Sequence, residues 1–305
     1  MPTHAPPVSA PAAVAPADLE AEARDRKHGV IYMLVAALGF SLMGLLVKIA
    51  STTFPTMELV FTRSLVMTVI TYAAIRRSGL SPLGVDRTTL MLRATFGAVA
   101  LSLFYLGIAR LPLGDAVTIQ YTAPVWTAIA AAVLLGERLR PLVLLGAVLS
   151  MAGVALVARP SFLFGGVALD GIGVAAVAGA AVLAGLAYTF TRKLRATDRP
   201  MVIIFYLSWV GMAGAIPFAL GGWVWPTGWH WILLLGIGLT THMGQVGLTE
   251  GMRRLEAGTA SAIGYVQVVL AFAWGALFLG DGVDALSIAG AALVVSSVLL
   301  VVRRG

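Results

Sequence analysis

Apolar residues run along this chain in long blocks, and polar residues collect between the blocks rather than alternating with them. Each block is close to the ~20 residues that a helix needs to cross about 30 Å of hydrocarbon. Strands of a membrane barrel would be about ten residues long and would alternate apolar and polar positions. The blocks therefore predict ten membrane-spanning helices, at about 29–50, 57–75, 88–108, 115–136, 141–158, 171–191, 201–220, 229–249, 258–279 and 284–302.

Composition supports lipid as the solvent, because 59% of the residues are hydrophobic and only 11% are charged. An ordinary soluble domain carries about 25% charged residues. The predicted fold class is an all-α polytopic membrane protein. Residues 1–28 differ, since five prolines and then a charged run predict a disordered tail. Cysteine is absent, which excludes disulfides and thiolate metal sites.

Positive charges predict the orientation of the helices. If the N-terminus is cytoplasmic, 17 of the 21 lysines and arginines lie on the cytoplasmic side. The outer loops hold only Arg110 and Arg159, while Lys48 and Arg63 fall within helices. The positive-inside rule therefore places both termini in the cytoplasm. Anionic headgroups explain the net charge of +7, so a nucleic-acid partner is not expected.

The chain contains an internal repeat. "RLPLGDA" at 110–116 returns as "RLEAGTA" at 254–260, and 18 of the 50 positions at 110–159 match those 144 residues later. This predicts two five-helix repeats, 29–160 and 171–304, around a central cavity. Five is odd, so the second repeat is inverted across the membrane, as in many secondary transporters. A duplication without transport is the alternative.

Several motifs resemble the EamA-type branch of the drug/metabolite transporter superfamily. They are Pro55 eight residues before Arg63, the "LPLGDA" turn, Pro124 and "LLGERL". The resemblance implies a ten-helix inner-membrane carrier that usually exports small organic metabolites, such as amino acids or amphipathic compounds. Some relatives look like importers of vitamins. The second repeat has Val268 in place of Pro124, so a matching kink in the ninth helix is in doubt.

Arg63 is the first candidate for binding. It lies six residues into the second helix, about 9 Å below the membrane boundary at 1.5 Å per residue. Charge within the membrane is costly and is a functional candidate by default. Its guanidinium could bind a carboxylate or phosphate of the cargo. The alternatives are an ion pair with Glu58 or bonds to the carbonyls of a broken helix.

The fourth helix supplies further candidates. Pro124 lacks an amide hydrogen and frees a carbonyl near Gln120. Such a broken, polar helix is tolerated in lipid only where it faces protein or a water-filled cavity. Interhelical hydrogen bonding is the alternative role for its polar residues. Together with Arg63, the predicted substrate-binding residues are Gln120, Tyr121, Trp126, Tyr265 and Gln267.

Other ionisable residues have simpler interpretations. Lys48 can reach the interface, and Asp115 suits the first turn of its helix. Glu137 is expected to be structural, at a turn flanked by arginines. His242 is expected to bond to a carbonyl.

These patterns favour a transporter over other classes. The four histidines lack metal-site spacing, and no nucleophile and base lie at equal depth, so neither a metal, a cofactor nor an enzymatic activity is expected. Nothing suggests the charged ring of a channel. The expected partners are the bilayer and a small amphipathic cargo, anionic or zwitterionic, moved by facilitated diffusion or exchange. The protein is expected to be a monomer or homodimer and to export; vitamin-like import or an enzyme acting on lipid-linked substrates are the alternatives.

Overall fold

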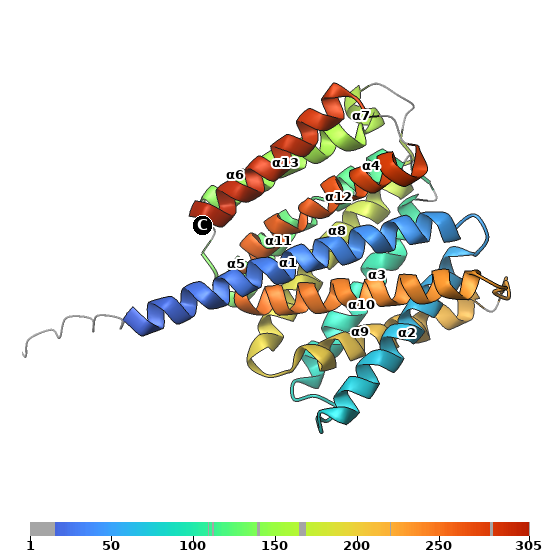
Figure 1. Ribbon diagram of the computed structural model, residues 1–305, viewed down its shortest axis with the longest axis horizontal. Coiled ribbons are helices and arrows are strands. Elements are labelled where there is room, and N and C mark those ends of the chain that lie inside the picture. The colour runs from blue at the N-terminus through green and yellow to red at the C-terminus, as the bar shows by residue number, and fades with distance from the viewer. Residues whose placement is uncertain are drawn as a thin grey trace, which may run out of the picture.

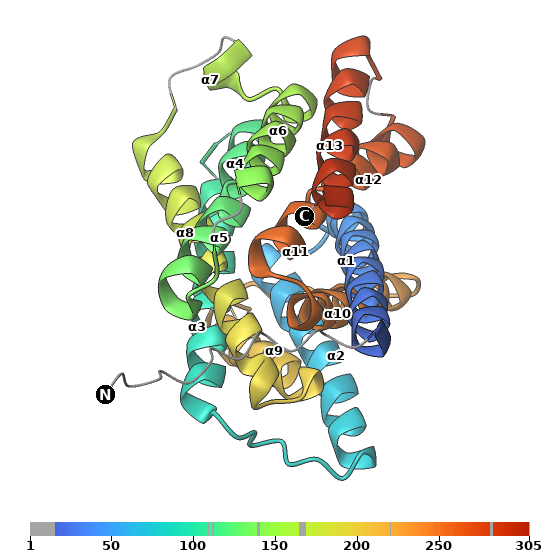
Figure 2. The same cartoon turned by 90° about the vertical axis from the view of Figure 1, so that its left-hand side faces the viewer.

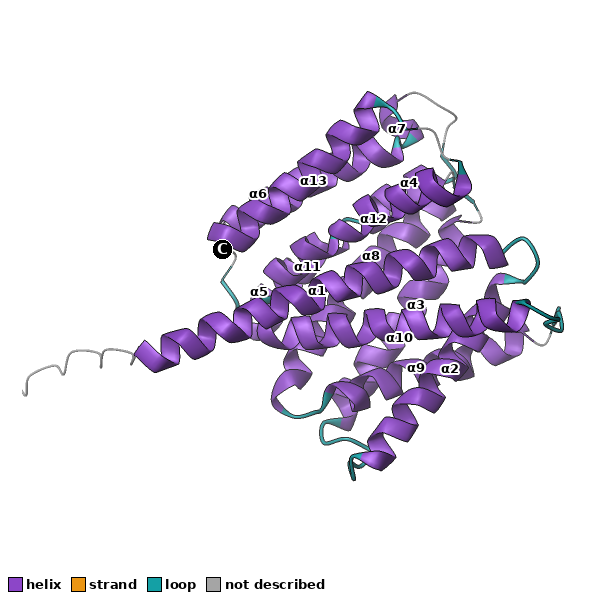
Figure 3. Cartoon of the chain, in the orientation of Figure 1, coloured by secondary structure: helices purple, strands orange, loops and turns teal. Residues whose placement is uncertain are grey.

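The computed structural model describes residues 16–304 apart from 109, 112, 139–140, 165–168, 220 and 281–282, and this part of the chain is helical, without strands (Figure 3). The helices are α1 (Pro16–Ala50), α2 (Thr56–Arg77), α3 (Arg87–Ile108), α4 (Leu113–Gln120), α5 (Ala123–Leu135), α6 (Pro141–Ala158), α7 (Ser161–Phe164), α8 (Gly171–Lys193), α9 (Pro200–Ala219), α10 (His230–Arg254), α11 (Ala257–Gly264), α12 (Val266–Trp274) and α13 (Ala285–Arg304). Leu194–Ala196 forms a 3-10 turn and Gly275–Leu279 a π-helical turn.

In the described residues, nine helices are long and apolar enough to cross a membrane. Two of these spans, Asp115–Leu135 and Ala257–Leu279, each contain a break and combine two helices. The prediction of an all-helical polytopic membrane protein is confirmed. The remaining predicted span, at 88–108, corresponds to α3, which is 22 residues long and packs along α8 and α9.

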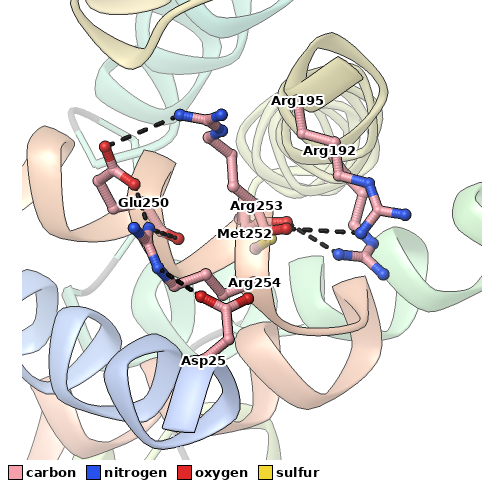
Figure 4. Close-up of polar contacts among 7 residues, drawn as sticks. All are labelled: Asp25, Arg192, Arg195, Glu250, Met252, Arg253 and Arg254. Carbon is pink, nitrogen blue, oxygen red and sulfur yellow. Dashed lines mark hydrogen bonds and ion pairs between the residues drawn. The ribbon is translucent and has the colours of Figure 1, made fainter. Parts of the chain in front are cut away.

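The start of α1 differs from the prediction. Disorder was expected over residues 1–28, but residues 16–28 are helical, while 1–15 lie outside the described part. The segment is rich in Ala, Glu and Arg, which favour helix. Tertiary contacts also hold its charges: Arg26 donates to the Val302 carbonyl at 2.9 Å, and Asp25 pairs with Arg254 at 3.1 Å (Figure 4).

Helices of the first half pair with helices of the second half. α1 packs along α10, α3 along α8, α2 against α9 and α6 against α13. The α6–α13 pair lies at one edge of the bundle in both ribbon views (Figures 1 and 2). Close contact of α1 and α10 requires glycine, because a Cβ atom on Gly247 would lie 2.5 Å from the carbonyl oxygen of Tyr32. The core is therefore shared between the halves.

Candidate functional site

Two helices are broken at the same position of the repeat. α4 ends just before Tyr121, and α11 ends just before Tyr265, 144 residues later. Pro124 explains the first break, because its nitrogen cannot donate to a carbonyl four residues back. The second break has Val268 at that position and forms without proline, so the doubt about a matching kink in the ninth helix was misplaced.

A tyrosine side chain of one half donates a hydrogen bond to a backbone carbonyl at the break in the other half. The Val125 N–H donates to the carbonyl of Thr122, three residues back, at 2.9 Å. The Tyr121 carbonyl instead accepts a 2.8 Å bond from the hydroxyl of Tyr265. The two tyrosine rings stack with their centroids 5.8 Å apart, and Tyr265 is fully buried. Because an unpaired carbonyl in lipid is costly, Tyr265 stabilises the broken backbone.

A cavity of about 200 Å³ lies beside these two breaks. An engineered cavity of about 150 Å³ admits benzene, so this one has room for a small organic group. It is lined by residues of α1, α3, α4, α5, α8, α10, α11 and α12, and by Tyr121. The lining residues are Met33, Ala36, Ala37, Phe40, Phe104, Gln120, Tyr121, Ala123, Pro124, Tyr188, Leu248, Met252, Ser261, Gly264 and Gln267.

The cavity is mainly apolar and aromatic, with a few polar groups. Its described lining residues include no Asp, Glu, Lys or Arg. Two of its polar atoms, Oε1 of Gln120 and Oγ of Ser261, are buried without a hydrogen-bond partner. A buried polar group left unpaired costs about 1–3 kcal/mol. Such a lining is suited to binding a polar group that enters the cavity.

The sequence candidates occupy three kinds of position. Gln120, Tyr121 and Gln267 line the cavity. Tyr265 lies behind Tyr121, where it forms the bond described above. Trp126 is 40% exposed and does not line the cavity; its backbone and Cβ lie close to Gly185 of α8.

Arg63 also lies outside the cavity lining. Its Nη1 is 3.9 Å from the sulfur of Met43, which is three residues beyond Phe40 on α1. The Nε atom of Arg63 is buried without a partner. Glu58 is fully buried and accepts a 2.9 Å bond from the Val224 N–H, and its other carboxylate oxygen has no partner. In the described structure the two side chains therefore do not form the ion pair considered as an alternative.

His242 likewise departs from the expected role. Its Nδ1 atom is buried without a partner, so this nitrogen does not form the expected bond to a carbonyl. The neighbouring Gln245 on α10 also has an unpartnered oxygen.

Sequence reasoning missed Ser261 and most of the aromatic wall. Ser261 precedes Tyr265 by four residues, so the two lie on one helical face, and this spacing is the available signal. Tyr188 and Phe40 carry no local signal, because their place in the wall depends on how α8 and α1 pack.

A buried ion pair ties four helices together at the end of the bundle where α5, α8 and α10 finish. Glu137 pairs with Arg192, and its second oxygen accepts a 3.1 Å bond from the N–H of Ala257, the first residue of α11. Arg192 also donates to the carbonyl of Met252 at 3.1 Å (Figure 4). The Arg192 and Glu137 side chains are 7% and 20% exposed. We call this pair the Glu137–Arg192 latch.

More arginines of the second half surround the latch. Arg254 pairs with Asp25 and Glu250, and Arg253 lies 3.9 Å from Glu250 (Figure 4). Arg195 donates to the carbonyl of Arg253 at 3.4 Å. The charged extension of α1 is thus bound to the end of α10.

Several known proteins are similar to this chain over most of its length. The pseudopaline exporter CntI of Pseudomonas aeruginosa (strain UCBPP-PA14) is 32% identical over 280 residues, which cover 91% of this chain and 96% of the exporter. Human solute carrier family 35 member G1 is 29% identical, with 88% and 77% covered. A solved crystal structure matches with a TM-score of 0.79 at 19% identity, over 89% of this chain and 95% of that chain, and so shares the fold.

The family comparison matches both halves separately. The model of the EamA-like transporter family matches residues 27–159 and again residues 171–303. The family and the names of the relatives indicate a transporter rather than an enzyme. The chain therefore belongs to the EamA-like transporter family.

Proposed function

We propose that this protein is a secondary transporter that exports small amphipathic metabolites of amino-acid type, zwitterionic or anionic, across the inner membrane. The observation that carries the proposal is the cavity between the two broken helices, with its aromatic wall and unpaired polar atoms. Discontinuous helices around a site near mid-membrane are typical of secondary transporters. The proposed binding residues are Gln120, Tyr121 and Gln267, which line the cavity, and Arg63 beyond it; Tyr265 supports this wall through its bond to the Tyr121 carbonyl.

The proposed architecture has ten spans, α3 included, in two inverted repeats at 29–160 and 171–304. Helix pairing supports it. A shift of about 144 residues relates α1 to α8 and α10 to α3, so it exchanges the α1–α10 pair with the α8–α3 pair. The same shift exchanges α2 with α9 and α6 with α13, which pack against each other. A twofold relation between the halves would produce this pattern.

Alternating access requires the two ends of the bundle to open in turn. The positive-inside rule supports an orientation in which both termini and the Glu137–Arg192 latch lie at the cytoplasmic end. The opposite end holds the Arg110–Asp170 pair, whose atoms lie 3.2 Å apart and whose side chains are 44% and 38% exposed. The more buried latch thus closes the cytoplasmic end, and its release would open the cavity inward.

The cargo would extend beyond the cavity toward Arg63. Met43, beside the Arg63 guanidinium, lies three residues from Phe40 of the cavity wall, about 4.5 Å along the helix. A carboxylate there could bind the guanidinium in bidentate fashion. Export is favoured because a relative that is similar to this chain over 96% of that relative's length is named an exporter.

The test is a comparison of metabolites in cells and medium. Strains would carry an empty vector, the wild type, Gln120→Leu, or Val133→Leu as a control, all at equal membrane abundance. Val133 is 77% exposed, so its variant should behave as the wild type. We expect one compound to accumulate in the medium with the wild type and the control alone. Accumulation inside the cells would reverse the direction, and no change in either compartment would contradict transport.

A further inference from the structure

The Ser261 hydroxyl is buried and makes no hydrogen bond, either to its own helix or to a neighbouring one. Serine and threonine within helices often donate to the carbonyl four residues back. Thr127, Thr189 and Thr191 do so here, at 2.9, 2.9 and 3.0 Å. Ser261 is 5% exposed, lines the cavity and has no partner. Its hydroxyl is therefore free to bind a group inside the cavity.

Gln120 presents a second unpaired oxygen to the same cavity. It is the last residue of α4, just before the break, and its Oε1 is buried without a partner. Gln120 belongs to the first half and Ser261 to the second. A ligand with at least two N–H or O–H donors could bond to both halves at once.

The remaining lining residues indicate the charge of that ligand. A carboxylate in the cavity would meet no Lys or Arg among the described lining residues. Arg93 lies outside the lining, and its Nε donates to the hydroxyl of Thr191. A protonated amine, in contrast, is stabilised by aromatic faces within about 6 Å. Phe40 and Tyr188 provide such rings in the wall.

We infer that the cavity binds the protonated primary amine of the cargo, with Gln120 Oε1 and Ser261 Oγ accepting its hydrogen bonds. The inference rests on the proposed function and makes it more specific: the amine is required, and an acidic group lies outside the cavity, toward Arg63. Compounds that present no N–H or O–H donor at this position bind weakly, because both oxygens would stay unpaired.

Direct binding to the purified full-length protein tests this inference. The probes are 2-phenylethylamine and phenylacetate, which are similar in size and opposite in charge, measured by equilibrium binding in detergent. We expect the amine to bind at least about tenfold more tightly than the acid. Ser261→Ala and Gln120→Leu should each weaken amine binding by about tenfold, as expected for a lost bond to a charged group.

Ser208→Ala is the matched control, since Ser208 is buried on α9 and donates to the Phe205 carbonyl at 3.0 Å, outside the cavity lining. It should leave the affinity for the amine unchanged. Equal affinity for the acid would overturn the inference. So would unchanged amine binding by folded Ser261→Ala and Gln120→Leu proteins.

Efflux from vesicles separates this inference from the proposed function. Wild-type protein would be reconstituted with each labelled probe inside. Amine binding without efflux of the amine would contradict transport and leave the amine site intact. Efflux of phenylacetate at the same rate as the amine would support the transporter and overturn the amine site. Selective efflux of the amine would support both.

Discussion

The hydroxyl of Tyr265 donates a 2.8 Å hydrogen bond to the backbone carbonyl of Tyr121, its counterpart in the other half of the chain. Each of these tyrosines occupies the break in its own half. A single side chain therefore couples the two discontinuous helices beside the cavity.

Removing this hydroxyl should weaken the protein. Tyr265→Phe keeps the stacked ring but leaves the Tyr121 carbonyl unpaired, which costs about 1–3 kcal/mol. We expect a lower midpoint of thermal unfolding in detergent. Tyr121→Phe is the control, because it retains both the ring and the accepting carbonyl. Equal midpoints for Tyr265→Phe and the wild type would show that the bond does not stabilise the break.

The Glu137–Arg192 latch should contribute more than the exposed pair at the other end. Glu137→Gln leaves Arg192 buried opposite a neutral amide, and losing one partner of a buried pair costs about 3–5 kcal/mol. Asp170→Asn removes a solvent-exposed pair, which contributes little because water and salt screen it. Unfolding measurements on both variants check the difference.

The latch variant should also open the cavity toward the cytoplasm. The chain has no cysteine, so a single Ala37→Cys in the cavity wall reports access. With Glu137→Gln, we expect faster labelling by an impermeant thiol reagent in inside-out vesicles. An unchanged labelling rate would mean that the latch is structural rather than a gate.

Orientation can be measured in the same cysteine-free background. Ser81 and Gly222 are exposed in loops that the positive charges place on opposite sides. An impermeant reagent should label Gly222→Cys in intact cells and Ser81→Cys after permeabilisation alone. The reverse pattern would invert the proposed topology.

A larger residue at Gly264 should obstruct the cargo without disturbing the fold. Gly264 lines the cavity, and a Cβ atom there would meet nothing within 4 Å. Gly264→Val should therefore lower the transport rate at little cost in stability. Gly44 has the same free space outside the cavity lining, so Gly44→Val serves as the control. Equal loss of transport by both variants would contradict the assignment of the cavity.

The carboxylate of Asp86, which lies outside the membrane-spanning helices, should make the free energy of unfolding depend on pH. The Thr89 hydroxyl and N–H donate to this carboxylate at 2.6 and 3.0 Å and hold its pKa below the usual range. A depressed pKa stabilises the fold above the unfolded value, near 4, and this stabilisation is lost as pH falls through the folded value. At pH 7, Asp86→Ala should lower the free energy of unfolding by about 1 kcal/mol, the usual cost of losing an N-cap side chain. The midpoint of thermal unfolding should fall accordingly. The difference should shrink at acidic pH, and a pH-independent difference would exclude the charge as its cause.

Hydropathy predicted the helix ends well because charged and loop-forming residues bound each apolar block. It failed at residues 16–28, where the charges are held by Arg254 and by the Val302 carbonyl, both distant in sequence. The break at Tyr265 had no proline to signal it, only its place in the repeat opposite Tyr121. Its backbone turns without proline, with the Val268 N–H donating three residues back to Tyr265.

The candidate site was predictable only where a polar residue adjoins a helix break. Gln120 and Tyr121 adjoin the Pro124 break and do line the cavity. Trp126 lies close by in sequence, but it belongs to α5, the helix that begins after the break, and it lies on the exposed face of that helix. Residues such as Tyr188 join the wall only through packing between the halves, which no local pattern encodes.

The pairing of α1 with α10 has a consequence for biosynthesis. About 180 residues separate the end of α1 from the start of α10, so α1 is synthesised well before its partner. α3 is likewise synthesised before α8, against which it packs. Until the second half is inserted, the glycine-bearing face of α1, where Gly39 lies against the backbone of Gly244, has no partner helix. Because each half alone lacks the helices that it packs against, we expect half-length chains to accumulate only when both are made together in one cell.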